Sequence, residues 1–252
     1  MTVVMGVDGA RGAWAACTWA GPGEPPVLAV LADPEAVLVA ARAAGAATVG
    51  LDLPLGLAAR GHRGADVAAR AHLVAAARRS PAQDARAAGS RLFMTPVREV
   101  VEAGGTYADA RALARRLGSP TPSAQAFALL GHVRRWDAHL PRWSGPDAPV
   151  LVEVHPELSF TRAAGPVPAP KRSARGACQR LDVLAGPTGL ACGRRALDDA
   201  LLAAPTDLAL DDALDAAAAA WTAWRVAADD PDVLRLPEHE ERDGDRLVRI
   251  LV

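Results

Sequence analysis

Two short apolar segments that each end in an aspartate constrain the fold of this chain most strongly. The run TVVMGVD (2–8) is rich in β-branched residues and stops at Asp8, which a glycine follows. The run ATVGLD (47–52) stops at Asp52, two residues before a proline. Short apolar runs bounded by such turn residues are typical of buried β-strands. The sequence therefore predicts two strands that carry a carboxylate at the same end.

The elements between and after these strands predict an α/β protein. The tight turn GARG joins the first strand to a second, which predicts a hairpin. We expect further strands at 13–20, 25–33 and 150–160, with a possible closing strand at 246–252, and helices at 34–45, 65–79, 95–104, 107–118, 123–140, 174–185, 190–203 and 211–227. A crossover helix between two strands is typical of an α/β sheet. We predict one domain over 1–252, a five-stranded mixed central sheet flanked by helices, and a helical insertion (58–145) after the fourth strand.

The charge is nearly balanced overall but unevenly distributed. The formal net charge of −1 excludes a globally basic nucleic-acid binder, although not a local basic patch. Residues 60–116 hold eleven arginines and five acids, whereas residues 198–245 hold fourteen acids and three arginines. Two solvated faces of opposite charge would explain this segregation. An arginine surface that binds phosphates, beside an acidic centre that binds metal, would explain it as well. Lys171 is the only lysine, a bias typical of a high-GC genome.

The cysteines and the hydropathy pattern exclude several classes of protein. Cys17, Cys178 and Cys192 are odd in number and widely spaced, so they indicate neither a zinc site nor a disulfide framework. Cysteines without partners suit a reducing cytoplasm. The chain has no basic segment followed by an apolar one at its start, and no uncharged apolar run of about 18 residues. We expect a cytoplasmic protein that has no membrane partner.

Four aspartates are candidates for a metal site. If the strands that end in Asp8 and Asp52 are parallel neighbours, their ends lie about 4.8 Å apart. Asp212 and Asp215 are three residues apart, which places them on one face of the last long helix, near its start. Carboxylates are ligands that magnesium prefers, and two such ions about 3.5–4 Å apart can stabilise both oxygens of a phosphoryl displacement.

Each of these aspartates also has a structural explanation. Asp8 followed by glycine is a common hairpin turn pair. Asp52 lies where a turn is expected, close to a proline. Aspartates near a helix start cap the helix or interact with its dipole.

The order of these motifs resembles a known family. A strand–Asp hairpin, a helix, a second strand–Asp and a late helix with DxxD resemble the ribonuclease H-like fold, in particular the branch of RuvC-type Holliday-junction resolvases. More closely, the chain resembles the bacterial family called domain of unknown function 429, described as predicted ribonuclease H-like nucleases. The matching segments are GVDGARGAW (6–14), GLDLPLGL (50–57), GSRLFMTPVREV (89–100), SAQAF (123–127), EVHPELSF (153–160) and DDALDAAAAAWTA (211–223).

The resemblance implies a ligand set for Mg²⁺ or Mn²⁺ ions. Asp8 and Asp52 match the acids at the ends of the two strands, and Asp212 and Asp215 match the pair on the helix. Asp215 is the preferred ligand of that pair, because it directly precedes the run of alanines expected to pack on the sheet. Asp211 can replace Asp212, since the register at a helix start is uncertain.

A polar pair near the end of the fifth strand adds two candidates. Alternation along VLVEVH places Glu153 and His155 on one face and the valines on the other. If that polar face borders the acids, Glu153 is an extra ligand and His155 a proton donor to the leaving oxygen. Alternatively, His155 is a structural histidine held by a neighbouring acid.

Four cationic residues are candidates for binding a phosphate-bearing substrate. Arg11 can clamp a phosphate in a bidentate manner, or it is an ordinary turn residue. Arg91 and Arg98 flank a predicted helix start that Thr95 would cap, which is a possible anion site. Lys171, in a proline-rich loop, is a weaker candidate.

Three functions follow as hypotheses. The first is a nuclease or phosphodiesterase that hydrolyses nucleic-acid phosphodiester bonds by a two-metal-ion, water-activated mechanism. The second is an actin-like or sugar-kinase-like phosphotransferase that uses ATP, although the second phosphate loop that this class needs is absent from the sequence. The third is a catalytically inactive nucleic-acid-binding module.

Overall fold

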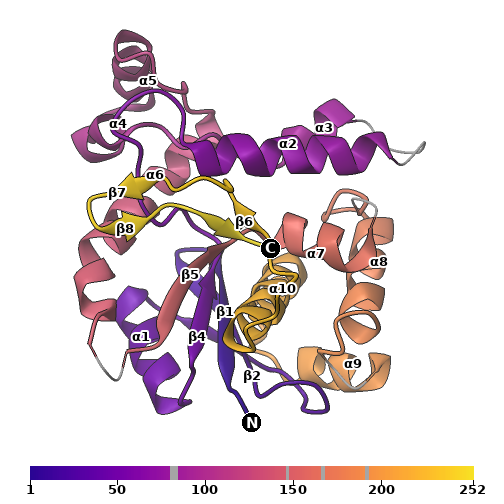
Figure 1. The fold of residues 1–252 in the computed structure, drawn as a ribbon. Coiled ribbons are helices and arrows are strands. Elements are labelled where there is room, and N and C mark those ends of the chain that lie inside the picture. The colour runs from indigo at the N-terminus through magenta and orange to yellow at the C-terminus, as the bar shows by residue number, and fades with distance from the viewer. Residues whose placement is uncertain (80–84, 146–147, 166–167, 191–192) are drawn as a thin grey trace. The chain divides into compact units, whose positions relative to one another are not determined.

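The computed structural model describes residues 1–79, 85–145, 148–165, 168–190 and 193–252 (Figure 1). The strands are β1 (Val4–Ala10), β2 (Ala13–Trp19), β3 (Val27–Leu31), β4 (Thr48–Leu51), β5 (Val150–Val154), β6 (Arg235–Leu236), β7 (Arg242–Asp243), β8 (Arg246–Leu247) and β9 (Ile250–Leu251). The helices are α1 (Pro34–Ala43), α2 (Gly64–Arg78), α3 (Ala85–Gly89), α4 (Arg98–Ala103), α5 (Tyr107–Arg116), α6 (Ala124–His139), α7 (Pro156–Ala164), α8 (Ala174–Ala185), α9 (Arg194–Leu202) and α10 (Leu210–Ala227), with a 3₁₀ turn at Leu140–Trp143.

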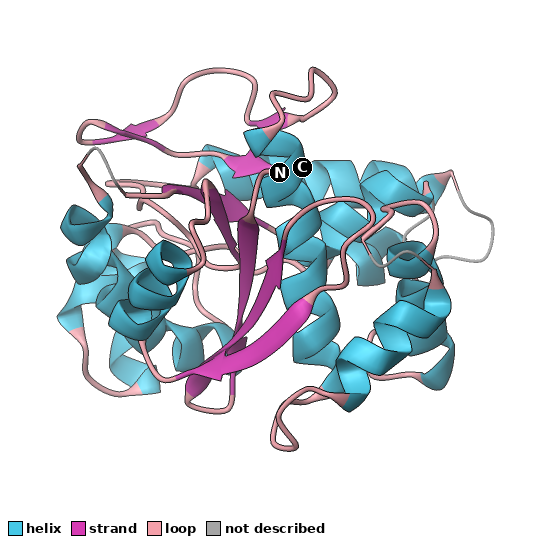
Figure 2. Ribbon diagram, turned by 90° about the horizontal axis from the view of Figure 1, so that it is seen from below, coloured by secondary structure: helices cyan, strands magenta, loops and turns pink. Residues whose placement is uncertain are grey.

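The main sheet is mixed and has seven strands in the order β3-β2-β1-β4-β5-β9-β6. Strand β2 is antiparallel to β1 and β3, whereas β1, β4 and β5 run parallel to one another. The predicted mixed sheet with flanking helices is therefore confirmed (Figure 2), and β1 and β4 are parallel neighbours, the arrangement on which the expected convergence of Asp8 and Asp52 depends. The predicted number of five strands is wrong, because β6 and β9 have two residues each and such short strands show no hydrophobic period.

The largest differences from the predicted bounds occur in three elements. The strand expected at 150–160 ends at Val154, because Pro156 occupies the first position of α7. The helix expected at 95–104 begins only at Arg98, with Val97 as its N-cap, so the predicted cap at Thr95 is wrong. The expected closing strand forms the short strands β8 and β9. Residues 191–192 lie outside the described residues. They include Cys192 and part of the start of the helix expected at 190–203.

The chain divides into two compact units. The first comprises Met1–Leu53, Trp143–Leu234 and Leu251–Val252, and the second comprises Pro54–Arg142 and Arg235–Ile250. The second unit contains most of the helical insertion expected at 58–145. The single domain stays a prediction.

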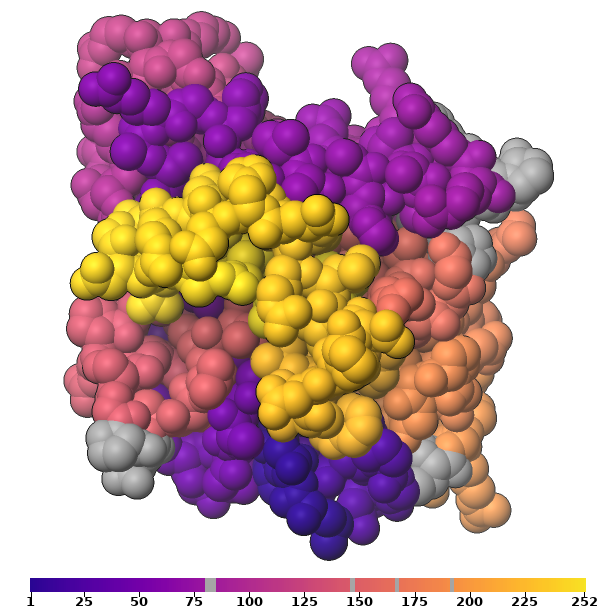
Figure 3. All heavy atoms as spheres, viewed as in Figure 1, coloured from indigo at the N-terminus to yellow at the C-terminus, as the bar shows by residue number. Residues whose placement is uncertain are grey.

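In the first unit, α10 packs against the sheet and is buried along most of its length. Its buried positions include five consecutive alanines, Ala216–Ala220, on the part of the helix that crosses β1 and β4 (Figure 1). On its other side α10 contacts α7 and α8. Ser159 on α7 and Thr222 on α10 share a buried hydrogen bond of 2.8 Å between their hydroxyl oxygens. The last turns of α10 and the residues that follow reach the surface in the view of Figure 3.

Two glycines allow this close packing. A Cβ atom at Gly6 of β1 would lie 2.0 Å from the Ala216 carbonyl oxygen, and one at Gly50 of β4 would lie 2.7 Å from the Ala219 carbonyl oxygen. Only residues without a side chain let the backbones of helix and strands approach this closely.

In the part of the chain that the structure describes, every helix is too short or too polar to cross a bilayer.

Within the second unit, a glutamate that is distant in the sequence caps helix α2. The backbone amides of Gly64 and Ala65, at the start of α2, each donate to the Glu241 carboxylate at 3.1 Å. We expect Glu241→Ala to lower the free energy of unfolding by about 1 kcal/mol, because two amides lose their acceptor. Urea unfolding measures this change. Glu240→Ala, which removes an exposed neighbouring carboxylate, serves as the control. Equal stabilities of the two variants would contradict this role.

Candidate metal centre and adjoining cleft

Asp8 and Asp52 lie on the same face of the sheet, although β1 continues two residues beyond Asp8, where the sequence predicted its end. Gly6 and Gly50 are paired in register across β1 and β4, and both face α10. Asp8 and Asp52 each follow two residues later, so alternation directs both side chains to the side of α10. The Asp52 amide donates to the Val7 carbonyl at 2.9 Å, which extends the parallel pairing to Asp52. The sequence prediction that these two acids converge is consistent with this placement.

Asp215 faces them from α10. It directly precedes Ala216, the residue whose carbonyl touches Gly6, and it is 4% exposed. Burial, then the charges of Asp52 and Asp215, raise the pKa of Asp8 well above its ordinary value. Burial raises the pKa of Asp215 to about 6, with Lys171 opposing the shift and Asp52 adding to it. These mutual effects show that the three carboxyl groups, from here on the acid cluster, act on one another.

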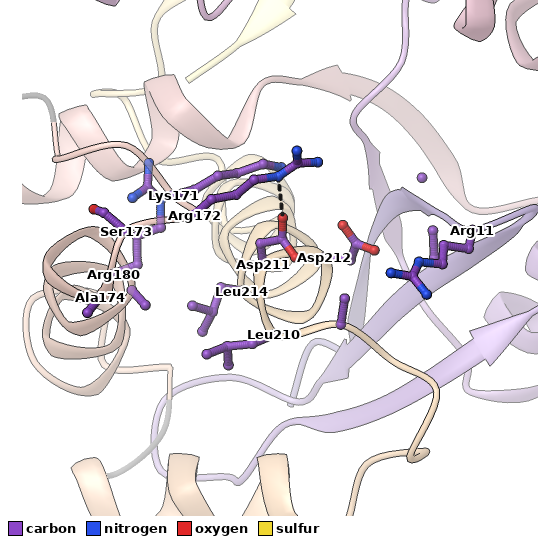
Figure 4. A pocket seen from close by; sticks show the side chains of 14 residues that line it. Arg11, Lys171, Arg172, Ser173, Ala174, Arg180, Leu210, Asp211, Asp212 and Leu214 are labelled. Carbon is purple, nitrogen blue, oxygen red and sulfur yellow. Dashed lines mark ion pairs between the residues drawn. The ribbon is translucent and has the colours of Figure 1, made fainter. Parts of the chain in front are cut away.

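Asp212 lies at the rim of this cluster. Burial and then the neighbouring Asp211 raise its pKa, whereas Lys171, Arg172 and Arg11 oppose the shift. Figure 4 shows the Asp212 carboxylate between Arg11 on one side and Arg172 on the other. Asp211 forms an ion pair with Arg172 at 3.7 Å. Asp212 also raises the pKa of Asp8, so its charge acts on the acid cluster as well.

Lys171 brings a positive charge into contact with the acid cluster. Its ammonium group forms an ion pair and hydrogen bond with Asp215 Oδ2. Burial acts to lower the pKa of Lys171, but Asp215, Asp8 and Asp52 outweigh it and the pKa is raised. The sequence pattern indicated only a weak role for this residue in substrate binding, whereas the structure brings it against the acids.

The acid cluster fits a hard divalent cation in its chemistry. Asp8 Oδ1 accepts from the Gly9 amide at 2.7 Å, whereas its buried Oδ2 has no hydrogen-bond partner among the described residues. Buried carboxylate oxygens without a partner are costly unless a cation compensates them. Among the described residues no three histidine, cysteine, aspartate or glutamate side chains are already arranged around a common metal position. A divalent ion would therefore have to draw Asp8, Asp52 and Asp215 together, with Lys171 beside them.

Of the two candidates near the end of β5, His155 acts on the acid cluster and Glu153 does not lie beside it. A Cβ at Gly50 would lie 3.3 Å from Val154 Cγ1, so Val154 faces α10 and Glu153 faces the opposite side of the sheet. The structure does not bring Glu153 to the acid cluster, because the polar side of this strand is the one away from α10. His155, beyond the strand end, does act on the cluster, since after burial it is the largest influence on the pKa of Asp52 and lowers it. Its Nδ1 is buried and without a hydrogen-bond partner among the described residues.

A cleft of about 710 Å³ opens beside the acid cluster. Its walls come from the end of β1, the loop into α8 and the start of α10 (Figure 4). Gly9, next to Asp8, and Lys171, bound to Asp215, both line it. Arg11 and Arg172 flank it with exposed guanidinium groups, which suits an anionic ligand.

The two arginines predicted in the insertion belong to the second unit. Arg98 forms ion pairs with Glu102 at 2.9 Å, with Asp137 at 2.6 Å and with Asp243. Three carboxylates around one guanidinium favour a structural role for Arg98 over binding of a substrate anion. Arg98 begins a helix of six residues, and Arg91 lies before it and is partly buried.

A buried ion pair that sequence reasoning missed holds the loop that carries Lys171. Arg180 on α8 binds Glu157 on α7 and donates to the Ala169 carbonyl at 2.8 Å. Gly176 lets the loop approach α8, because a Cβ there would lie 2.1 Å from the Pro170 carbonyl oxygen. The sequence shows Arg180 and Glu157 only as ordinary charged residues on predicted elements, so no signal marks them as partners.

The raised pKa of Asp215 predicts the direction of a pH effect on the metal-free protein. An aspartate has a pKa of 3.8 when unfolded, against about 6 here, so between these values the folded state binds more protons. The contribution of Asp215 to the free energy of unfolding therefore falls as the pH rises from about 4 to about 6. Urea unfolding in the presence of a chelator measures it. Asp215→Asn should be more stable relative to the parent at pH 7 than at pH 4, and a constant difference would contradict the shift.

Comparison with known proteins identifies the family of the chain. The comparisons with curated proteins and with solved structures found no match. A family model described as "Protein of unknown function (DUF429)" matches residues 6–242, a range that includes the acid cluster, Asp212, His155 and Lys171. The chain therefore belongs to the DUF429 family.

Proposed function

We propose that this protein is a divalent-metal-dependent nuclease or related phosphodiesterase with a ribonuclease H-like arrangement of acids. The observation that carries the proposal is the acid cluster itself. Asp8 lies near the end of β1 and Asp52 directly follows the adjacent parallel strand β4, and Asp215 faces them from α10 beside an open cleft. The antiparallel β1–β2 hairpin, the parallel β4 and a late helix across the sheet agree with the resemblance to the ribonuclease H-like fold.

The residues around the cleft have complementary roles in such a reaction. Bound Mg²⁺ or Mn²⁺ would neutralise the phosphate charge and lower the pKa of a water molecule. Asp8, Asp52 and Asp215 would hold the ion, with Asp212 as a further ligand at the cleft rim. Arg11 and Arg172 would bind the phosphate backbone of a nucleic acid from opposite sides (Figure 4). His155, next to Asp52, would donate a proton to the leaving oxygen.

A cleavage screen with purified protein tests the proposal. Labelled single-stranded DNA and RNA, duplexes, RNA–DNA hybrids and branched junctions are incubated with Mg²⁺, with Mn²⁺ or with a chelator. We expect cleavage of at least one substrate class with metal and none with the chelator. Protein with Asp8→Asn separates this activity from a contaminating nuclease. The proposal fails if no substrate is cleaved, or if the variant cleaves as fast as the parent.

A further inference from the structure

Lys171 differs from the other basic residues of the chain both in its side-chain type and in its surroundings. It is the one lysine of a chain that has 27 arginines. Its ammonium group contacts Asp215, and the charges of Asp8 and Asp52 act on it as well. Its charge is among the largest influences on the pKa of each of the three members of the acid cluster. A lysine differs from an arginine in being a compact point charge, closer in shape to a metal ion than a planar guanidinium is.

The backbone around Lys171 is fixed on both sides. The Ala169 amide donates to Gln179 Oε1 at 2.7 Å, and the Pro170 carbonyl accepts from the Ser173 amide at 2.9 Å and from the Ser173 hydroxyl at 2.7 Å. Ser173 in turn caps α8, where its hydroxyl accepts from the Gly176 amide at 3.0 Å. These hydrogen bonds fix the backbone on either side of Lys171, and they therefore position the Cα atom from which its side chain extends to Asp215.

The charges of the cluster indicate how many metal ions it can hold. When Asp8, Asp52 and Asp215 are ionised, their three negative charges exceed the single positive charge of Lys171 by two, whereas the charge of Asp212 at the rim is also opposed by Arg172 and Arg11. One divalent cation balances this difference. A second ion would leave the buried cluster with an excess of positive charge, which is costly in a partly desolvated site.

We propose that Lys171 fills one of the two cation positions of a two-ion site, so that the acid cluster binds one divalent ion instead of two. This inference rests on the proposed function, because it concerns the same acids. In the reaction, the Lys171 ammonium would stabilise negative charge on the phosphate from the position that a second ion takes in a two-metal mechanism. The side chain is 39% exposed and lines the cleft, so a substrate phosphate can reach it.

Binding of Mn²⁺ to the purified full chain tests this inference without any activity measurement. Isothermal titration and the electron paramagnetic resonance signal of free Mn²⁺ give the stoichiometry and the Kd. We expect one ion per chain in the parent protein. Lys171→Met should bind a second ion or bind the first about tenfold more tightly, a change of about 1.4 kcal/mol.

Three further variants make the result specific. Lys171→Gln repeats the loss of charge with a polar side chain, in case Lys171→Met fails to fold, and thermal unfolding confirms that each variant is native. Lys171→Arg keeps the charge and should still bind one ion. Arg175→Met, which removes an exposed charge from the start of α8, should leave the Kd for Mn²⁺ within about twofold of the parent.

The outcomes separate this inference from the proposed function. Two ions in the parent, or an unchanged or weaker Mn²⁺ affinity in Lys171→Met and Lys171→Gln, would overturn the inference even if Asp8-dependent cleavage is found. Tighter Mn²⁺ binding in these variants would support it even if no nucleic acid is cleaved. Absence of Mn²⁺ binding in the parent and in both variants would overturn it together with the metal dependence of the proposed function.

Discussion

Asp8→Asn and Asp215→Asn are each expected to lower the rate of metal-dependent cleavage by at least about a thousandfold, which corresponds to about 4 kcal/mol of transition-state stabilisation. Each substitution replaces one oxygen of a buried carboxylate by an amide nitrogen, which cannot bind a cation. Neither should unfold the protein. In Asp8→Asn the remaining side-chain oxygen would still be able to accept from the Gly9 amide, and the loss of a repelling buried charge favours the metal-free fold.

Two measurements together make this prediction specific. The unfolding temperature in the presence of a chelator at neutral pH should be equal to or higher than that of the parent. Added Mn²⁺ should raise the unfolding temperature of the parent and have little effect on either variant. Asp211→Asn is the matched control on the same helix, because Asp211 pairs with Arg172 at the rim. The assignment would be wrong if Asp8→Asn and Asp215→Asn kept activity within about tenfold of the Asp211→Asn control.

Gly6→Ala is expected to destabilise the protein by about 3 kcal/mol or more, at the upper end of what overpacking costs. The new Cβ would lie 2.0 Å from the Ala216 carbonyl oxygen and 2.1 Å from the Ala220 amide nitrogen, distances at which α10 has to move. Because Asp215 is the residue before Ala216, a shifted helix also carries this carboxylate away from Asp8. Urea unfolding measures the stability, and Mn²⁺ titration of any folded fraction measures the site.

Gly9→Ala supplies the control for this effect. Gly9 lies on the same strand, and a Cβ there would meet no atom within 4 Å. We expect a change in the free energy of unfolding of less than about 1 kcal/mol. If Gly6→Ala were as stable as Gly9→Ala, the close contact between α10 and β1 would not exist in solution.

The parts of the fold that the sequence predicts are those with a strong local pattern. Strands β1 and β4 are apolar runs bounded by turn residues, and α10 has helical periodicity, so the type of these elements follows from the sequence. The parallel pairing of β1 and β4 was only a condition for the convergence of Asp8 and Asp52, and the structure contains it. The two-residue strands β6 and β9 have no such pattern and were missed. The strand before Pro156 was predicted too long, because an apolar alternation does not show where a proline starts a new helix.

The candidate site is predictable to a different degree. The meeting of Asp8, Asp52 and Asp215 follows from strand ends, helix register and family resemblance. The position of Glu153 depends on which face of β5 is turned to α10, and period-two alternation cannot distinguish the two faces. The contact of Lys171 with Asp215 spans 44 residues and depends on a loop braced by Arg180, which no local pattern encodes.

The alanine run of α10 has a consequence for how the acid cluster can vary. Since the atoms nearest to a Cβ at Gly6 or at Gly50 are main-chain atoms of the helix, the separation of helix and strands is set mainly by atoms that are the same in every amino acid. Substitutions elsewhere in the core can be accommodated when neighbouring side chains change rotamer. At the contact of Gly6 and Gly50 with α10, from here on the seam, the nearest atoms belong to the main chain and cannot adjust in this way. We therefore expect the spacing of the carboxylates to tolerate extensive change in the surrounding apolar residues, as long as the small residues of the seam are kept.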